Sequence, residues 1–357
     1  MEYFIAQKRL TVHHAGGKAP NDIYTLCERR GWTELFYPNV ENCRSQILLR
    51  LKRSLLVARF WLSAMNLLKP GDVVFYQHPA RFGSKIAYHF IKLLQKKNVR
   101  FIMLIHDLDS LRYHLLYKDD SKTNVLFEDG EFIKLFDVIV CHNEHMKAHL
   151  LSQDIPEDRL ICLELFDYLL PASVQASASA EKSFVIAGNL NENKCGYIYE
   201  LANQECDYKI NLYGMNFNDS LNTKKNLVFQ GSYSPDELPF VIKGSYGIVW
   251  DGNSIDTCEG ATGNYLRYNN PHKMSLFMAS GIPVITWKHA AIADFVSEHG
   301  VGITVNSLRE IPERLSQISD VQYSQMRANV LIIQQQVIRG FFFNRAIDTA
   351  LEKLKQK

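Results

Sequence analysis

Residues 269–285 read NNPHKMSLFMASGIPVI, and the order of residue types in this stretch indicates the fold class. Pro271 suits the first turn of a helix, and Gly281 suits the position just after its last turn. The PVI that follows begins a short β-branched run of the kind found in buried strands. The stretch therefore predicts a helix that leads directly into a strand, which is half of a repeating α/β unit.

Similar strand patterns recur along the whole chain, with helix-length segments between them. Helical spacing of apolar residues is clear at Ser84–Lys96 and Asn143–Ser152. The predicted strands are Glu2–Ala6, Glu34–Tyr37, Asp72–Gln77, Arg100–Ile105, Asp137–Cys141, Arg159–Leu163, Ser183–Ala187, Tyr208–Tyr213, Asn226–Gln230, Tyr246–Trp250, Pro283–Trp287 and Gly302–Val305. Strands with helix-length gaps predict βαβ units and parallel sheets.

The composition changes at residues 171–182, PASVQASASAEK, which are small and polar and are typical of a linker. A chain of 357 residues has the length of about two domains. We therefore predict two doubly wound α/β domains at 1–170 and 183–335, with a cleft between the carboxyl ends of their strands. A C-terminal helix at 336–357 is expected to pack on the first domain or in an oligomer interface.

Composition excludes several classes of protein. The chain is 46% hydrophobic and carries a net charge of +2, so it lacks the strongly basic character of a dedicated nucleic-acid binder. Its seven cysteines are spread out and include no CxxC pair, which excludes a disulfide framework and a zinc ribbon. Neither a signal-peptide core nor a membrane-spanning run is present. We expect a cytoplasmic protein, with attachment to the inner face of the membrane left open.

Two turns in the second domain have the residues of a phosphate site, although the chain contains neither GxGxxG nor Walker A. Tyr268, Asn269 and Asn270 precede a helix start whose free N–H groups, with Lys273, would suit a diphosphate. An ordinary capped helix explains the same pattern. Gly188, Asn189 and Lys194 follow the first strand of this domain and would approach phosphate oxygens, but Asn-rich turns also form for local reasons. Tyr213 ends the next strand, where its ring would stack on a base or simply pack.

The first domain has a comparable turn at 15–22, AGGKAPND. Gly16, Gly17 and Lys18 would approach a sugar diphosphate from across the cleft, unless the following Asn21 or Asp22 is only a helix cap. Asp107, Asp109, Asp22 and His106 are the candidate general bases, because each follows a predicted strand and faces the cleft. A cap or a helix-orienting hydrogen bond is the alternative for each of them.

Six motifs, in order, resemble the bacterial β-1,6-galactofuranosyltransferases of O-antigen assembly and the related glucosyltransferases of serine-rich adhesin glycosylation. They are IHDLDSLR at 105–112, FDYL at 166–169, AGNLNENKCGYIY at 187–199, WDGNSIDTC at 250–258, GNYLRYNNPHK at 263–273 and AAIADF at 290–295. The resemblance implies a GT-B fold of two Rossmann-like domains, with a UDP-sugar on the second, the acceptor on the first and no required metal. Asp107 and Asp109 would otherwise suggest a DxD metal site.

One position departs from the wider GT-B pattern. Many such enzymes hold the ribose with a Glu in the helix after Pro271, and this chain has Leu276 there. The long connection that begins at Asp251 is expected to bind or cover the donor instead. It is not an EF-hand loop, because no Gly occupies its sixth position.

These observations predict a UDP-sugar-dependent, metal-independent hexosyltransferase. UDP-galactofuranose is the favoured donor, and the acceptor is a surface saccharide, with lipid linkage of this acceptor left open. The alternatives are a glucosyltransferase that acts on a glycosylated adhesin and a catalytically silent GT-B subunit that binds a glycosylated partner. We also expect a homo-oligomer. The basic helix at 44–59 would lie on an anionic membrane, or dock on the protein with its charges reaching solvent.

Overall fold

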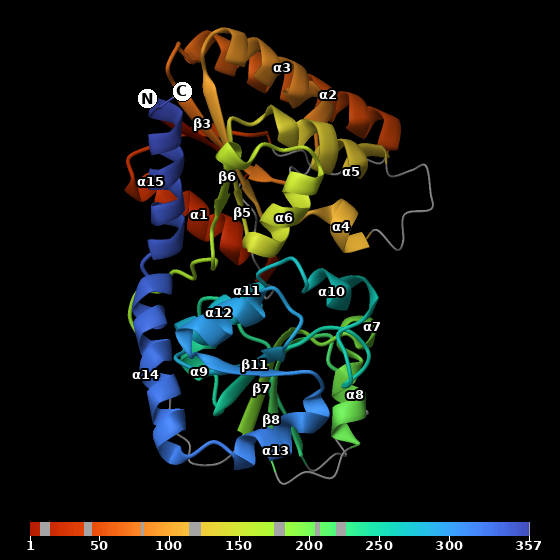
Figure 1. The fold of residues 1–357 in the computed structure, drawn as a ribbon. Coiled ribbons are helices and arrows are strands. Elements are labelled where there is room, and N and C mark those ends of the chain that lie inside the picture. Colours follow the sequence, from red (N-terminus) through yellow and green to blue (C-terminus); the bar gives the residue numbers. More distant parts are fainter. Residues whose placement is uncertain are drawn as a thin grey trace.

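The computed structural model describes residues 1–7, 15–38, 45–79, 82–113, 123–174, 183–203, 208–218 and 226–356. Within them the chain forms two six-stranded parallel sheets, in the orders β2-β1-β3-β4-β5-β6 and β12-β11-β10-β7-β8-β9. Figure 1 shows two domains, one above the other, and each consists of one sheet with helices packed around it. The predicted two-domain GT-B architecture is confirmed.

The first sheet has helices on both faces, and the side chains of its strands alternate between them. The strands are β1 (Glu2–Ala6), β2 (Thr33–Phe36), β3 (Val73–His78), β4 (Arg100–Ile105), β5 (Val138–Cys141) and β6 (Leu160–Cys162). Phe4, Phe75 and Ile102 share a core with α1 (Lys18–Arg29) and α15 (Phe341–Lys355). Their neighbours in sequence face α2 (Gln46–Leu67) and α3 (Ser84–Lys96). This period of two is what a sheet buried on both faces requires.

Shorter elements complete the first domain. They are η1 (Ala15–Gly17), α4 (Asp109–Tyr113), α5 (Thr123–Phe127), η3 (Glu128–Phe132), η4 (Ile133–Leu135), α6 (Glu144–Ser152) and η5 (Glu157–Arg159). The predicted 171–182 linker is described only as far as Val174, and the rest of it lies outside the described residues.

The second sheet repeats the plan. Its strands are β7 (Ser183–Asn189), β8 (Lys209–Met215), β9 (Leu227–Gly231), β10 (Tyr246–Val249), β11 (Val284–Trp287) and β12 (Gly302–Val305). Its helices are α7 (Glu192–Cys195), α8 (Tyr197–Ala202), α9 (Leu238–Val241), α10 (Gly260–Tyr265), α11 (His272–Ala279), α12 (Ile292–His299), η7 (Leu308–Glu310), α13 (Ile311–Ser316) and α14 (Asp320–Val337).

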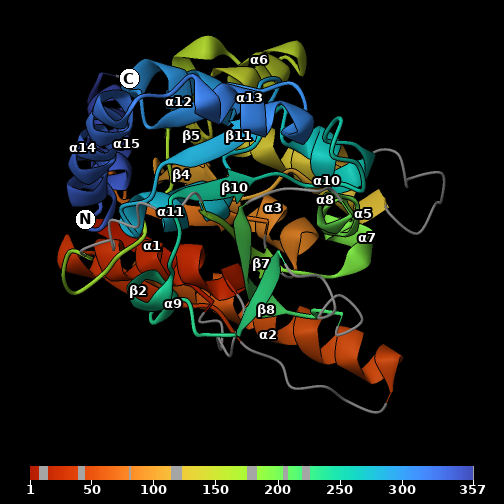
Figure 2. The ribbon, with the colours of Figure 1, turned by 90° about the horizontal axis from the view of Figure 1, so that it is seen from below.

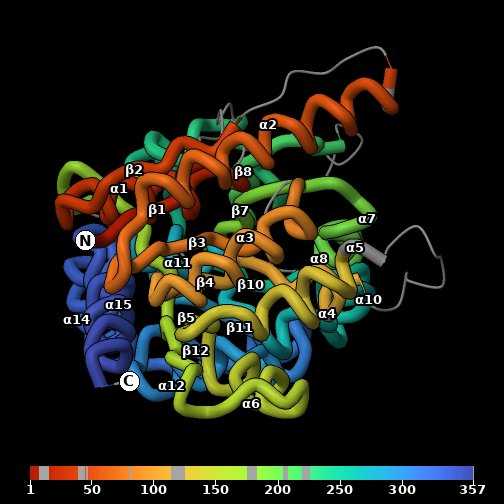
Figure 3. Tube along the Cα trace, turned by 90° about the horizontal axis from the view of Figure 1, so that it is seen from above, coloured from red at the N-terminus to blue at the C-terminus, as the bar shows by residue number. Residues whose placement is uncertain are grey.

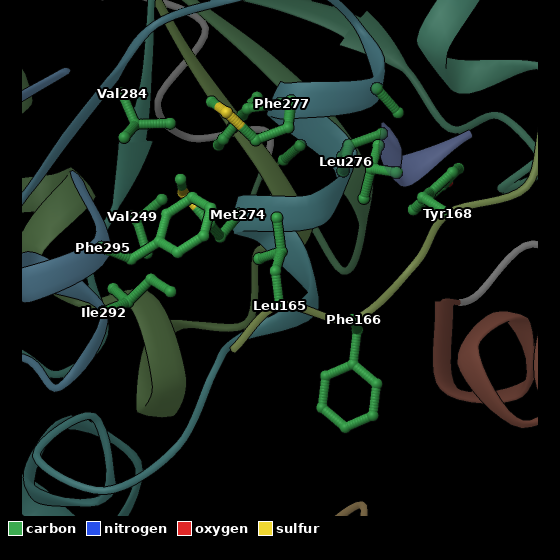
Figure 4. Close-up of a cluster of buried hydrophobic side chains, with 14 of the residues drawn as sticks. Leu165, Phe166, Tyr168, Val249, Met274, Leu276, Phe277, Val284, Ile292 and Phe295 are labelled. Atoms are coloured by element: carbon green, nitrogen blue, oxygen red, sulfur yellow. The ribbon is translucent and has the colours of Figure 1, made fainter. Parts of the chain in front are cut away.

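Helix α11 is the helix predicted from residues 269–285, and it is almost entirely buried. Figure 4 shows Met274 and Phe277 in the apolar cluster with Val249 and Val284. Gly247 makes room for this packing, because a Cβ there would come within 2.4 Å of the Phe277 ring. This packing fixes the position of α11 on the second sheet.

The chain crosses between the domains twice, near Tyr168 and near Gly340. The two crossings run together, since the Tyr168 N–H donates to the Val337 carbonyl over 3.0 Å. After the second crossing α15 lies along the first domain, as Figure 1 shows for the helix beside α1. Phe343 is fully buried there against Phe75, with ring centroids 5.5 Å apart. Phe342 and Phe343 therefore pack within the chain, while Phe341 beside them is 40% exposed.

Candidate functional site: the cleft between the two sheets

A cavity of about 380 Å³ lies between the carboxyl ends of the two sheets and is lined by both domains. It brings together most of the residues singled out from the sequence: Gly16, His106, Asp107, Gly188, Asn189, Lys194, Tyr213, Asp251, Asn269, Asn270 and Lys273. Gly17, Lys18, Asp22, Asp109 and Tyr268 do not line it. The cavity is thus the common site toward which separate motifs converge.

Two glycines allow close approach of backbone to the cavity on its second-domain side. Gly188 has φ +125° and Gly214 has φ +146°. A Cβ at Gly214 would lie 1.8 Å from the Gly188 carbonyl oxygen, so this pair of strand ends accepts only glycine at that position. A Cβ at Gly188 would instead contact the Lys273 side chain at 3.8 Å.

Two lysines, Lys273 and Lys194, supply positive charge beside these glycines. They differ in whether the ammonium group is paired with other residues. The Lys273 ammonium donates to Asp251 Oδ1 over 2.7 Å and to the Trp250 carbonyl over 2.9 Å. Burial acts to lower the pKa of Lys273, but Asp251 and nearby thiols raise it above its usual value. Lys194 lines the same wall, and its ammonium makes no hydrogen bond or ion pair with a described residue. Lys194 is therefore available to an anionic ligand.

The start of α11 presents polar atoms that lack partners. Asn269 Oδ1 and His272 Nε2 are buried without a hydrogen bond to any described residue, and both residues line the cavity. Burial lowers the pKa of His272 to about 4, so its ring is neutral at pH 7, and it stacks on Tyr168 with centroids 5.0 Å apart. Buried polar groups normally find a partner, so these atoms point to a ligand. His272 was not singled out from the sequence, because a single His beside a helix start carries no distinctive signal.

Asn270 lines the cavity, and its side chain also joins the two domains. Its Nδ2 donates to the carbonyls of His142 and Glu164 over 2.8 and 2.9 Å. Its N–H donates to His142 Nδ1 over 2.9 Å, and its Oδ1 accepts from Asn143 over 2.7 Å. Burial lowers the pKa of His142 to about 4, which keeps this ring neutral and able to accept. We call these four residues, His142, Asn143, Glu164 and Asn270, the interdomain clasp.

Lys18 and Asp22 also hold the domains together and do not face the cavity. The Lys18 ammonium lies 2.8 Å from Asp22 Oδ1, from the Leu169 carbonyl and from Asp236 of the second domain. Asp22 Oδ2 accepts the Leu169 N–H over 2.9 Å. Burial raises the pKa of Asp22 to about 6, against the opposing effect of Lys18. Because both groups are buried and fully occupied, this geometry disfavours the predicted donor-binding and base roles.

Of the two carboxylates that follow β4, Asp107 lines the cavity and Asp109 does not. Asp107 lines it, with Oδ2 3.1 Å from Arg112 Nη1. Asp109 begins α4 instead, beside Asp129, which accepts the Ser110 N–H over 2.6 Å. Burial raises the pKa of both groups, and Arg112 opposes the rise at Asp107. Asp107 is therefore the carboxylate with access to a ligand.

Two neighbours orient the Asp107 loop. His106 hydrogen-bonds to Gln77 and stacks on Phe166, with ring centroids 5.3 Å apart. The Tyr265 hydroxyl accepts the Leu108 N–H over 2.9 Å and acts to lower the pKa of Asp107. Tyr265 belongs to α10, within the long connection expected to bind or cover the donor, and it was not singled out from the sequence. The second domain thus touches the loop that carries Asp107.

The remaining predicted residues have mixed placements. The Tyr213 ring lines the cavity, while its hydroxyl accepts the Lys243 N–H over 3.1 Å. The Tyr268 ring packs near His149, outside the cavity. Leu276, at the position where many relatives of the fold carry Glu, is buried and lines the cavity. Among the described residues no group of three or more His, Cys, Asp or Glu side chains is arranged as metal ligands.

The two sheets and the cleft between them have the GT-B architecture, and known structures agree on this fold. A sucrose-phosphate synthase from Thermosynechococcus elongatus superposes with a TM-score of 0.66 at 12% identity, covering 99% of both chains. The Anabaena HepE structure in complex with UDP and glucose superposes with a TM-score of 0.60 at 13% identity, covering 98% of this chain and 99% of that one.

Sequence comparisons give the family. Residues 2–165 and 184–350 match the models for the N-terminal and C-terminal domains of glucosyltransferase 3-like proteins. The β-1,6-galactofuranosyltransferase WbbI of Escherichia coli K12 is 30% identical over 81% of this chain and 82% of its own length. Glucosyltransferase 3 of Streptococcus gordonii is 25% identical over 94% of both chains. The chain belongs to the glucosyltransferase 3-like family of glycosyltransferases.

Proposed function

We propose that the protein transfers a hexose from a UDP-sugar to a saccharide acceptor, with the nucleotide on the second-domain side of the cleft. The observation that carries this proposal is the wall formed by Lys194, Gly188 and the start of α11. There a cation and two buried polar atoms, none with a partner among the described residues, line one cavity. A diphosphate would satisfy them together, because it offers several acceptor oxygens and negative charge.

In the proposed reaction Asp107 is the general base. The acceptor oxygen bonds to the anomeric carbon as the bond from that carbon to the diphosphate breaks, and the hydroxyl proton passes to the Asp107 carboxylate. UDP leaves with the electron pair, and its charge is stabilised by Lys194, Lys273 and the N–H groups that begin α11. Arg112 and Tyr265 lower the pKa of Asp107 and so oppose the rise that burial causes. These cations supply the charge that a divalent ion provides elsewhere, so we propose that no metal is needed.

We favour galactofuranose as the transferred sugar, since the relative with 30% identity is a galactofuranosyltransferase. Glucose transfer to a glycosylated adhesin is the second candidate, because two curated relatives are glucosyltransferases. Both candidate donors contain UDP, and the cavity residues named above would contact the UDP part. These residues therefore do not distinguish the two sugars.

The test incubates the full chain with a panel of UDP-sugars, including UDP-galactofuranose and UDP-glucose, in EDTA. Saccharide acceptors are offered in free and lipid-linked form, and UDP release and product mass are followed. Transfer from one UDP-sugar in EDTA supports the proposal, and the sugar in the product settles the donor. Turnover that requires Mn²⁺ or Mg²⁺ contradicts metal independence. Binding of a glycosylated partner without any transfer indicates the catalytically silent subunit.

We also propose that the protein works as a homo-oligomer in the cytoplasm, in surface polysaccharide synthesis. Phe342 and Phe343 are buried within the chain and Phe341 is 40% exposed, so an oligomer interface has to use other surfaces as well. Light scattering on the full chain gives the assembly state, and a monomeric mass at all concentrations contradicts this part of the proposal.

A further inference from the structure

Helix α2 exposes a continuous stripe of large aliphatic side chains. Ile47, Leu51, Leu55 and Leu62 are 73%, 56%, 71% and 55% exposed, and Leu48 beside them is 62% exposed. At 3.6 residues per turn these positions fall within an arc of about 100° of the helix surface. Surface helices normally place such a stripe against the core.

The core contact of α2 is made by a different side of the helix. Leu49, Val57, Trp61 and Ala64 are buried, and the last three belong to the core between α2, α3 and the first sheet. The exposed stripe is therefore a second apolar side that the described chain leaves uncovered. Figures 2 and 3 show the start of α2 extending beyond the rest of the first domain.

The same region is strongly basic. Neither α2 nor its neighbour α3 contains an Asp or Glu, while the whole chain balances 40 basic with 38 acidic residues. The basic residues of the two helices are Arg50, Lys52, Arg53, Arg59, Lys85, Lys92 and Lys96. None of them takes part in the ion pairs formed among the described residues. An unneutralised cluster of this size attracts an extended anionic surface.

We propose that the exposed stripe of α2, with the basic residues of α2 and α3, is a docking surface for an anionic lipid bilayer. Helix α2 lies in the plane of the interface, with Leu51 and Leu55 among the acyl chains and the cations at the headgroups. This surface belongs to the domain that carries Asp107, so docking would bring that side of the cleft to the membrane. The proposal does not depend on which sugar is transferred.

Charge decides between a bilayer and a second copy of this chain. Two copies joined through this face would bring two cation clusters together, and like charges in one interface oppose association. An anionic bilayer satisfies both features at once, because lipid headgroups neutralise the cations while the acyl region accepts the leucines. No described helix has the length and apolar character needed to span a bilayer, so the proposed attachment is peripheral.

The experiment is co-sedimentation of the full chain with vesicles of phosphatidylcholine alone or mixed with phosphatidylglycerol. The protein should bind the anionic vesicles, and more weakly at high salt. Changing Arg50→Gln, Lys52→Gln and Arg59→Gln together should weaken binding about 100-fold, because each cation near the surface contributes about fivefold. Changing Leu48→Ser, Leu51→Ser and Leu55→Ser together should weaken it at least tenfold.

A matched control removes exposed aliphatic side chains elsewhere. Val321, Leu331 and Ile332 on α14 are 78%, 41% and 62% exposed, and their replacement by Ser should leave vesicle binding unchanged. Transfer to a water-soluble acceptor should persist in every variant, which separates failure of this proposal from failure of the proposed function. Melting temperatures verify that each variant is folded.

Three outcomes overturn the proposal. They are absence of binding to both kinds of vesicle, equal binding to neutral and anionic vesicles, and equal loss of binding in the α14 control. A fall in molecular mass on light scattering with the leucine variant, without loss of vesicle binding, would instead assign the stripe to self-association.

Discussion

Two turns of similar composition begin the first helix of each domain, AGGKAPND at 15–22 and AGNLNENK at 187–194. In the first, the lysine is buried between Asp22, Leu169 and Asp236. In the second, Lys194 lines the cavity and makes no ion pair with a described residue. The composition of a turn thus indicates that a lysine sits near the cleft, while distant partners decide whether it is available to a ligand.

The same contrast holds for the carboxylates of the first domain. Asp22 is buried and bound by Lys18 and the Leu169 N–H, whereas Asp107 lines the cavity. We expect Asp107→Asn to lower kcat by about 10² to 10⁴, the range for loss of a general base, with little change in UDP affinity. Steady-state kinetics and UDP titration measure the two quantities.

Asp109→Asn is the control for that prediction, because its carboxylate lies two residues away and does not line the cavity. It should retain most of kcat. If Asp107→Asn keeps near-normal turnover, the base is another group, and His106 becomes the candidate.

Lys18→Met should act on stability. It leaves Asp22 buried without its cation, which typically costs about 3 to 5 kcal/mol of unfolding free energy. Urea unfolding measures the loss, and Lys194→Met, which breaks no ion pair with a described residue, is the matched control. An unchanged unfolding free energy with a raised KM for the donor would return Lys18 to the donor site.

The interdomain clasp should make stability fall in mild acid. The pKa of His142 is lowered to about 4 in the fold, while an unfolded chain takes up the proton near pH 6.5. Protons therefore favour the unfolded state as pH falls from about 6.5 toward 4, and by pH 5 this group alone should cost about 2 kcal/mol. Urea unfolding across this range measures the slope, and His142→Gln should reduce it. An identical slope in that variant would exclude His142 as its source.

Tyr265→Phe should have the smallest effect on stability, about 1 kcal/mol for a lost hydrogen bond. Without the hydroxyl, the pKa of Asp107 rises further, so the acid limb of the kcat/KM profile should move to higher pH. A packing role alone would leave that limb in place. A pH–rate profile beside a melting curve distinguishes the two results.

The strands could be predicted from the sequence because their signal is local. All twelve predicted strands overlap an observed one, and β1, β4 and β12 have the predicted bounds. β-branched runs, turn residues and helix-length gaps lie next to one another in the chain, so no knowledge of tertiary contacts was required.

The site was only partly predictable, because partners remote in sequence decide each role. Asn270 is a clasp residue through His142, 128 positions away, and Leu108 meets the Tyr265 hydroxyl across 157 positions. The apolar stripe of α2 was hidden for a similar reason. Apolar residues occur all round that helix, and only its packing on the sheet shows which of them stay exposed.

The most direct test of the account is UDP titration by calorimetry on Lys194→Met and Lys18→Met in parallel. Because we propose that the nucleotide binds against the second domain, Lys194→Met should weaken UDP binding by about 1.5 to 3 kcal/mol, the range for a charged hydrogen bond. The folded fraction of Lys18→Met should bind UDP like the unaltered protein. Wild-type affinity in Lys194→Met, with the loss in Lys18→Met instead, would contradict the account and place the nucleotide on the first domain.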